Sequence, residues 1–197
     1  MEVLYSVPKD DRGKEMLERG TVLFPCAVYD RDTRQYVTGE IPPHWHPELE
    51  IFLLMEGRAH ITFADGEFDL EPGEGFFANS GVLHGVSNPG LDACHYHSMV
   101  FDASVLSGAS GSAYELLYLR PFLEQGVPYR IFRPGDCRQG ELMAELFSDA
   151  FAACREKGDG YEFLVRNLLS QIFLILKGDS GNGRSGKSSQ QELRMKQ

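Results

Sequence analysis

The chain has 197 residues, of which 42% are hydrophobic and 24% are charged, and its formal net charge at pH 7 is −10. This composition is typical of a globular protein, and the length suits one domain with an appendage. No run of about 18 apolar residues and no basic N-terminal region followed by an apolar block is present, so the sequence predicts neither a membrane span nor a signal peptide. The acidic balance excludes nucleic-acid binding by this chain alone, because phosphates are held by clustered Lys and Arg.

The cysteines are scattered along the chain and form no C-x-x-C pair. They are Cys26, Cys94, Cys137 and Cys154. This spacing argues against a thiolate zinc site and fits reduced thiols in a cytoplasm. We expect all four cysteines to be small apolar fillers.

Residues 1–20 are polar and mixed in charge. The segment from Asp10 to Arg19 is compatible with one or two helical turns, since an aspartate favours the start of a helix. Two interpretations of this segment are open. It is either a frayed terminus or an arm that folds over a pocket.

Residues 21–102 carry short apolar and aromatic segments between turn residues, at a spacing of roughly 8–12 positions. Leu49–Met55 is apolar at both parities, which predicts a strand that is buried on both faces and covered on its outer face by helices further on. The other segments expected to be extended are Thr21–Tyr29, Gly39–Pro43, Arg58–Phe63, Phe68–Leu70, Gly75–Ala78 and, as the last strand, His95–Phe101. The sequence therefore predicts a mainly β fold, a sandwich or barrel of jelly-roll type.

After residue 102 the apolar residues recur at spacings of three and four, as on the face of a helix. The predicted helices are Ala113–Phe122, Glu141–Arg155 and Tyr161–Lys177, with a loop over Gly126–Asp136. Residues 158–160 separate the last two helices, which therefore form a C-terminal α-helical hairpin. The last helix is apolar over more than one stripe, so we expect a homodimer contact there, with Leu169 among the outward apolar residues.

Residues 178–189 are rich in Gly and Ser and predict a flexible linker. The residues that follow, up to Gln197, resemble the opening turns of another element. We therefore expect this chain to be cut from a longer one.

Two histidines precede the apolar stretch Ile51–Met55 and a glutamate stands directly before it, at His44, His46 and Glu50. Side chains two apart in a strand share a face, so these three lie on one face provided that Pro47 adds no bulge. Two imidazoles and a carboxylate make most of a divalent metal site. The alternative is a pocket lined by hydrogen-bonded histidines without metal. Three further histidines have no helpful partner spacing and are expected to be surface or satisfied strand histidines: His60, His95 and His97.

A second cluster downstream completes a resemblance to the cupin family. The first cupin motif is present as Gly39, His44, His46, Glu50 and Gly57, and the second as Gly66, Pro72, His84 and Asn88. The sequence departs from the second motif at Glu74, where a Gly is usual, and more residues than usual precede His84. The resemblance implies metal and ligand binding by His44, His46, Glu50 and His84, with one divalent ion such as Zn, Ni, Fe or Mn as cofactor.

The order of the predicted segments, an N-terminal arm, a cupin sheet, a helical hairpin and a linker, is similar to that in the N-terminal half of an AraC-type bacterial transcription regulator. The segments with similar sequence are Phe24–Tyr29, Leu53–Gly57 and Asn79–His84, and the resemblance covers about residues 20–177. It implies an arm (1–20), a cupin sensing domain (21–102), a helical dimerisation segment (103–177), and a linker with the start of a missing DNA-binding domain (178–197).

The resemblance implies that the protein is not an enzyme. It implies a cytoplasmic homodimer that binds a small-molecule effector, with sugar as the family association, and that reaches DNA only through the missing helix-turn-helix domain. The alternative is a metal-dependent cupin enzyme, a dioxygenase or isomerase, which the metal motif supports equally well. A third alternative is a cupin without a ligand. Fold alone does not decide among them.

Overall fold

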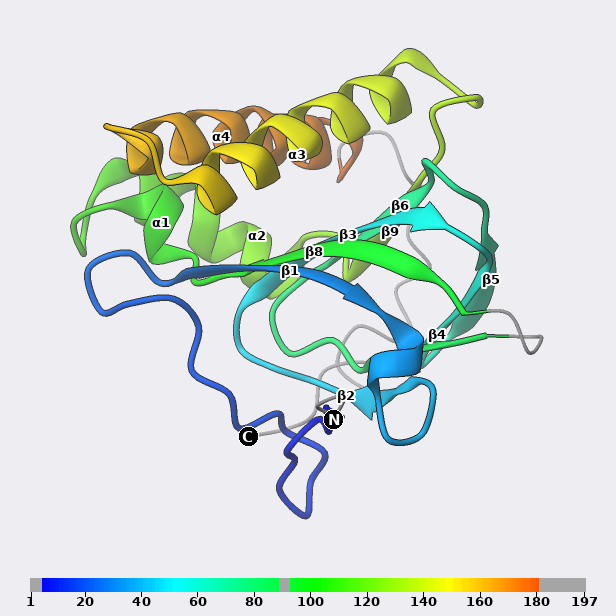
Figure 1. Cartoon of the computed structure of the whole chain (residues 1–197). Coiled ribbons are helices and arrows are strands. Elements are labelled where there is room, and N and C mark those ends of the chain that lie inside the picture. Colours follow the sequence, from blue (N-terminus) through cyan, green and yellow to red (C-terminus); the bar gives the residue numbers. More distant parts are fainter. Residues whose placement is uncertain (1–4, 89–92, 181–197) are drawn as a thin grey trace.

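The computed structural model describes residues 5–88 and 93–180. Its strands form two antiparallel sheets, and helices cover the outer face of one of them (Figure 1). The five-stranded sheet has the order β1 (Cys26–Asp32), β8 (His95–Phe101), β3 (Leu49–Glu56), β6 (Gly75–Ala78) and β9 (Tyr129–Phe132). The four-stranded sheet has the order β2 (Ile41–His44), β7 (His84–Ser87), β4 (Ala59–Phe63) and β5 (Gly66–Leu70).

Strand β3 is buried on both faces because it is apolar at both parities. Leu49, Ile51 and Leu53 belong to a core shared with the helices. Phe52 and Leu54 point the other way, into a second core between the two sheets. The prediction of a doubly buried strand under a helical cover is thereby confirmed.

The helical cover is the predicted hairpin, formed by α3 (Arg138–Glu156) and α4 (Tyr161–Ser180), which lie side by side over the sheet (Figure 1). The shorter helical segments are a 3₁₀ turn (Thr33–Gln35), α1 (Ser104–Ser107), a π-helical segment (Tyr114–Leu119) and α2 (Arg120–Gln125). Helix α4 continues through residues 178–180, so these are helix and not linker. The rest of the expected linker, residues 181–197, lies outside the described residues.

Several strand predictions were wrong in position or missing. Strand β1 starts at Cys26 and runs through Asp32, across residues expected to be a loop, because it pairs with β8 along its whole length. Strand β7 was not expected as a strand. Strand β9 lies in the segment expected to be a loop, so β8 is not the last strand. Pro128 precedes β9, and β9 pairs only with β6 at the sheet edge, where a neighbouring proline is tolerated.

Three of the four cysteines are buried, as expected, but Cys137 is exposed at the start of α3. The free thiols of Cys26 in the sheet and Cys154 in α3 contact each other, with their sulfur atoms 3.9 Å apart. Within residues 5–88 and 93–180, no helix has the length and apolar character needed to cross a membrane.

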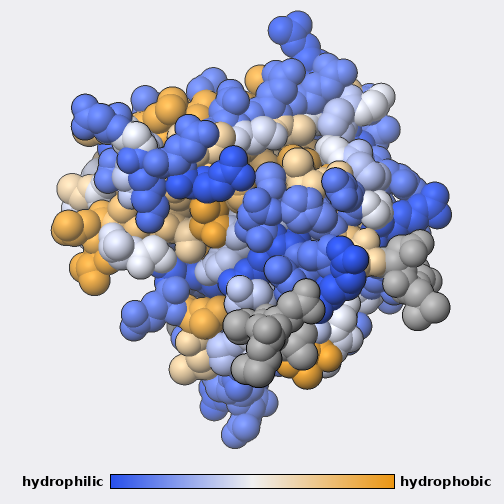
Figure 2. Space-filling model, viewed as in Figure 1, coloured by the Kyte–Doolittle hydropathy of each residue, from blue (hydrophilic) through white to orange (hydrophobic). Residues whose placement is uncertain are grey.

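The surface is mostly polar, and hydrophobic side chains gather on the side where the segment before β1 meets the helices (Figure 2). On α4 the outward residues differ from the prediction. Leu169 is only 1% exposed and packs in the core, whereas Phe163 and Leu174 are 73% and 64% exposed. Phe163 and Leu174 are eleven residues apart, three helical turns, and therefore share one face of α4.

We expect Gly75→Ala to destabilise the sheet strongly. A Cβ atom at Gly75 would lie 2.1 Å from the carbonyl oxygen of Phe52 and 2.4 Å from the ring of Phe132. Overpacking of this kind should lower the free energy of unfolding by about 2–3 kcal/mol. Gly135→Ala is the matched control, because nothing lies within 4 Å of its Cβ position. Urea unfolding measures both variants, and equal midpoints would contradict the expectation.

Candidate functional site

The four residues implied as metal ligands come together between the two sheets. His44 ends β2 and lies opposite His84 of β7 in the four-stranded sheet. Glu50 lies on β3 in the five-stranded sheet, and His46 lies in the connection from β2 to β3. The expectation of one strand with a shared face was therefore wrong. The chain leaves the four-stranded sheet after His44 and enters the other sheet at β3, so the side chains converge from facing elements.

Glu50 is the centre of the hydrogen-bond network. Its Oε2 lies 3.0 Å from the Nε2 atoms of both His46 and His84. The hydroxyl of Ser98, on the neighbouring β8, donates to Oε1 at 2.6 Å. All four of the candidate ligands are buried, and one donor atom of each lies within 4.8 Å of the others.

Each histidine is oriented by a backbone carbonyl two residues away. His44 Nδ1 lies 3.0 Å from the oxygen of Pro42, and His84 Nδ1 lies 2.8 Å from that of Val82. His46 Nδ1 makes the same contact with Glu48 at 3.2 Å. A carbonyl only accepts, so each Nδ1 carries a hydrogen and each Nε2 faces the cluster. This arrangement is typical of histidines that bind a metal.

Burial and mutual contact shift the pKa values of the cluster. Burial, followed by the neighbouring His84, holds the pKa of His44 well below its usual range. Burial alone would raise the pKa of Glu50, but hydrogen bonds from His46 and His84 hold it well below its usual value. Burial opposes charge on His84, yet its bond to Glu50 raises its pKa. These shifts favour an ionised Glu50 and a neutral His44, the forms that bind a divalent ion, whereas His84 would have to release its proton to do so.

The N-terminal segment reaches this cluster. Its backbone is tied to Trp45, because Glu15 N donates to the Trp45 oxygen at 2.8 Å and Trp45 N donates to Gly13 at 3.1 Å. The carboxylate of Glu15 lies 3.7 Å from His44 Nε2 and is bonded to the guanidinium of Arg19. The described part of this segment, residues 5–20, therefore lies over a pocket, in keeping with the second of the two interpretations.

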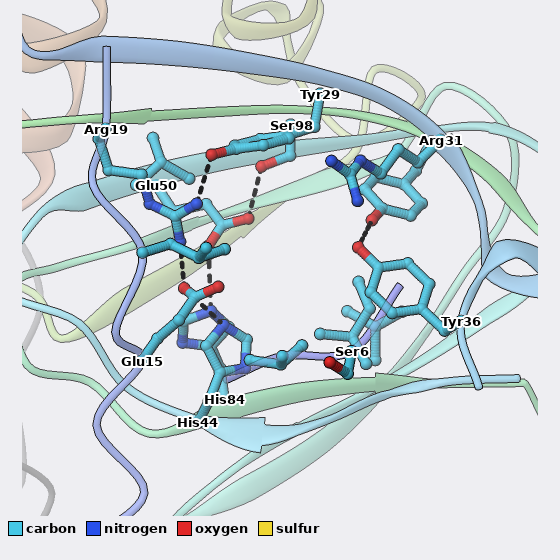
Figure 3. A pocket seen from close by; sticks show the side chains of 16 residues that line it. Ser6, Glu15, Arg19, Tyr29, Arg31, Tyr36, His44, Glu50, His84 and Ser98 are labelled. Atoms are coloured by element: carbon cyan, nitrogen blue, oxygen red, sulfur yellow. Dashed lines mark hydrogen bonds and ion pairs between the residues drawn. The ribbon is translucent and has the colours of Figure 1, made fainter. Parts of the chain in front are cut away.

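A cavity of about 60 Å³ lies between the arm and the two sheets (Figure 3). Arg19 and Glu15 are at one end beside His44 and His84, and Arg31 is at the other (Figure 3). Near Arg31 the hydroxyls of Tyr36 and Tyr96 are 2.6 Å apart. Hydrogen-bonding groups therefore lie at both ends of the cavity, and apolar side chains such as Ile41, Val86 and Val100 also line it.

Arg19 is a buried cation whose hydrogen bonds are incomplete. It is 9% exposed, and its guanidinium bonds Glu15 and the hydroxyl of Tyr29. Its Nε has no hydrogen-bond partner among the described residues. Because an unsatisfied buried donor is costly, this nitrogen marks a place where a water or ligand oxygen is favourable.

The sequence did not single out several residues of this cavity. They are Glu15, Arg19, Tyr29, Arg31, Tyr36, Tyr96 and Ser98. Two pairs stand at strand spacing, and that signal was available: residues 29 and 31 in β1, and residues 96 and 98 in β8. Glu74, the departure from the second motif, lies away from the cluster and bonds Arg133 at 3.2 Å.

Comparisons with known proteins find a matching domain family and a similar regulator. Residues 35–100 match the cupin domain model. The uncharacterised HTH-type transcriptional regulator YdeC of Bacillus subtilis (strain 168) is 28% identical over 194 residues, which cover 95% of this chain and 64% of the relative. The chain thus spans less than two thirds of the length of that relative.

Two AraC-like or ToxT structures are among the solved structures found to be similar to this chain. The unsaturated fatty acid-bound ToxT of Vibrio cholerae strain SCE256 has a TM-score of 0.51 at 11% identity, over 84% of this chain and 58% of that chain. The AraC-like transcriptional activator CuxR has a TM-score of 0.47 at 14% identity, over 84% and 52% of the two chains. At such identity the likeness to ToxT concerns the fold alone. Residues 35–100 thus match the cupin domain, within a chain that is similar to an HTH-type transcriptional regulator.

Proposed function

We propose that this chain is the effector-sensing and dimerisation part of an AraC-type bacterial transcription regulator. In this proposal residues 1–20 are the arm, residues 21–102 a cupin jelly roll that binds the effector, and residues 103–177 the dimerisation segment. Residues 178–197 lead to a helix-turn-helix unit that reads DNA in the cytoplasm. The observation that carries the proposal is the cavity between the arm and the sheets, with hydrogen-bonding groups at both ends, in a chain that is similar to a regulator over 95% of its length.

The size of the cavity couples effector binding to the arm. About 60 Å³ is room for only a few water molecules. A sugar, or another effector of that size, needs space that Glu15 and Arg19 now fill. It therefore binds better when the arm has moved, and it shifts the arm equilibrium by that difference in affinity, typically about 1–3 kcal/mol. The moved arm then changes how the DNA-binding units are held.

The hydrogen-bonding side chains that line the cavity favour an oxygen-rich effector. A molecule that displaces Glu15 must itself offer an acceptor to Arg19, because a buried guanidinium left alone is costly. The hydroxyls of Tyr36 and Tyr96 supply further hydrogen-bonding groups at the other end. Sugar hydroxyls meet these needs. A divalent ion held by the histidine cluster would supply a positive centre for one of the effector oxygens.

The second candidate function is a metal-dependent cupin enzyme, a dioxygenase or isomerase. The observation that favours it is the set of three buried histidines and one carboxylate around one point. An enzyme needs no DNA partner, so the DNA experiment below separates the two candidates.

We expect this chain to bind no promoter DNA specifically and the full-length parent to do so. The described residues hold no basic helix suited to the phosphate backbone, and the net charge is −10. Gel-shift titration of both proteins against promoter fragments, with and without a panel of sugars, measures this. The proposal also predicts that one sugar changes the affinity of the parent by about fivefold or more. A specific complex of the chain alone that survives about 200 mM salt would contradict it.

We expect about one tightly held divalent ion per chain in the cluster of His44, His46, Glu50 and His84. Elemental analysis after purification without chelator and without a nickel column measures it, and His84→Ala should lower the content by about one ion per chain. His60→Ala is the control, because His60 is bonded to Asp69 away from the cluster. A metal content below about 0.1 per chain in the unmodified protein would rule out metal binding and leave a metal-free pocket.

We expect a homodimer through the exposed face of α4. Light scattering should give twice the 22.1 kDa chain mass. Phe163→Glu and Leu174→Glu should each produce monomers, because a charge would be buried at the contact. Val37→Glu is the control, since Val37 is 65% exposed in a loop outside the helical hairpin. A monomeric unmodified chain at high concentration would contradict the dimer.

A further inference from the structure

Three potential metal ligands lie together outside the cavity, on strands β1 and β8. Asp30 lies directly opposite His97 in the register of these strands. His95 is two residues before His97, so it shares that face of the sheet. Sequence spacing had left both histidines without a partner, because the partner lies on the neighbouring strand. The face is the helix-covered one, since the ring of His97 stacks on Phe151 of α3.

The donor atoms converge on one point. Asp30 Oδ1 lies 2.6 Å from His95 Nε2 and 3.5 Å from His97 Nε2. One oxygen is thus shared by two imidazole nitrogens, and all three donor atoms lie within 4.8 Å of one another. Around a tetrahedral Zn²⁺ with bonds of about 2.0–2.1 Å, ligand atoms lie about 3.3 Å apart. The Asp30–His95 contact must lengthen by less than about 1 Å for an ion to bind between these atoms, and the Asp30–His97 distance already fits.

The surroundings hold the ligands but leave an open side. The His97 ring lies 4.0 Å from the Phe151 ring with an interplanar angle of 5°, which fixes its orientation. The side chains of His95 and Asp30 are 33% and 43% exposed. An ion bound here would complete its coordination with water, as ions with three protein ligands do.

One neighbouring charge opposes a cation. Arg155 Nη1 lies 3.5 Å from Asp30 Oδ2, the oxygen that faces away from His95. It competes for the carboxylate but leaves Oδ1 free for an ion. Removing this guanidinium should therefore tighten metal binding.

We propose that Asp30, His95 and His97 form a second divalent-metal site, separate from the cupin cluster and suited to Zn²⁺. Imidazole nitrogen with a carboxylate is a donor set that favours zinc and its neighbours over Mg²⁺ or Ca²⁺. The site joins β1 to β8 on the face of the sheet that packs against Phe151 of α3.

Calorimetric titration of the chelator-treated full chain with zinc chloride tests the proposal. His95→Gln, His97→Gln and Asp30→Asn should each bind one zinc ion fewer than the unmodified chain, whatever number the cupin cluster binds. Arg155→Gln should bind zinc about twofold to fivefold more tightly at this site. Magnesium chloride should give no binding at this site.

His60→Gln is the matched control. His60 also lies on a strand beside two carboxylates, but Asp69 contacts its Nδ1 and Glu67 faces its Nε2, so the three cannot share one ion. This variant should keep the zinc count of the unmodified chain. The proposal is overturned if the Asp30, His95 and His97 variants bind as many ions as the unmodified chain. It is also overturned if His60→Gln loses an ion to the same extent. Circular dichroism in chelator identifies any variant that fails to fold, and the remaining folded ligand variants then decide.

Discussion

The carboxylate of Glu50 is buried between the two sheets, and the geometry of the cavity depends on how its charge is stabilised. An ionised carboxylate in such a place costs several kcal/mol unless hydrogen bonds surround it. His46 and His84 supply two of these bonds and Ser98 a third. Because His84 belongs to one sheet and Ser98 to the other, both sheets must keep their relative position for Glu50 to stay charged. The site and the sheet packing therefore stabilise each other.

The strand that carries Glu50 also explains the helical layer. Strand β3 has no polar face to offer to water, so its outer side chains must be covered. Helices α3 and α4 supply that cover and share one core with the sheet. The same packing places Phe151 against His97, on the face of β8 that points away from the cavity. The helices that cover the apolar strand β3 therefore also pack against His97 of β8, outside the cavity.

The sequence was informative where the signal is local. Apolar residues on both faces of the Leu49–Met55 segment correctly predicted a strand that is buried on both sides. Apolar residues that recur every three or four positions correctly predicted the helical hairpin. The four side chains that the motif singled out lie together. The reason offered for that convergence was wrong, because the chain changes sheets between His44 and Leu49.

What the sequence could not supply is the pairing of distant segments. The contact of Glu15 and Arg19 with the cluster depends on a backbone bridge from the arm to Trp45. The cluster of Asp30 with His97 depends on strand register, which places residues 67 positions apart directly opposite. Neither feature leaves a periodic pattern in its own segment. Strand β9 was missed for the same reason, since its pairing with β6 outweighs the loop-like composition around it.

Strand β8 carries residues of both clusters, and its pleat keeps them separate. Ser98 faces the cavity and bonds Glu50, whereas His95 and His97 face the helices. Alternate side chains of a strand point to opposite faces, so adjacent residues 97 and 98 are separated by the backbone of the sheet. A change of side chain at His97 therefore leaves the hydrogen bond of Ser98 to Glu50 in place. An ion on the helix side and an effector in the cavity can each bind without sharing a ligand, and any influence of one on the other must pass through movement of the strand itself.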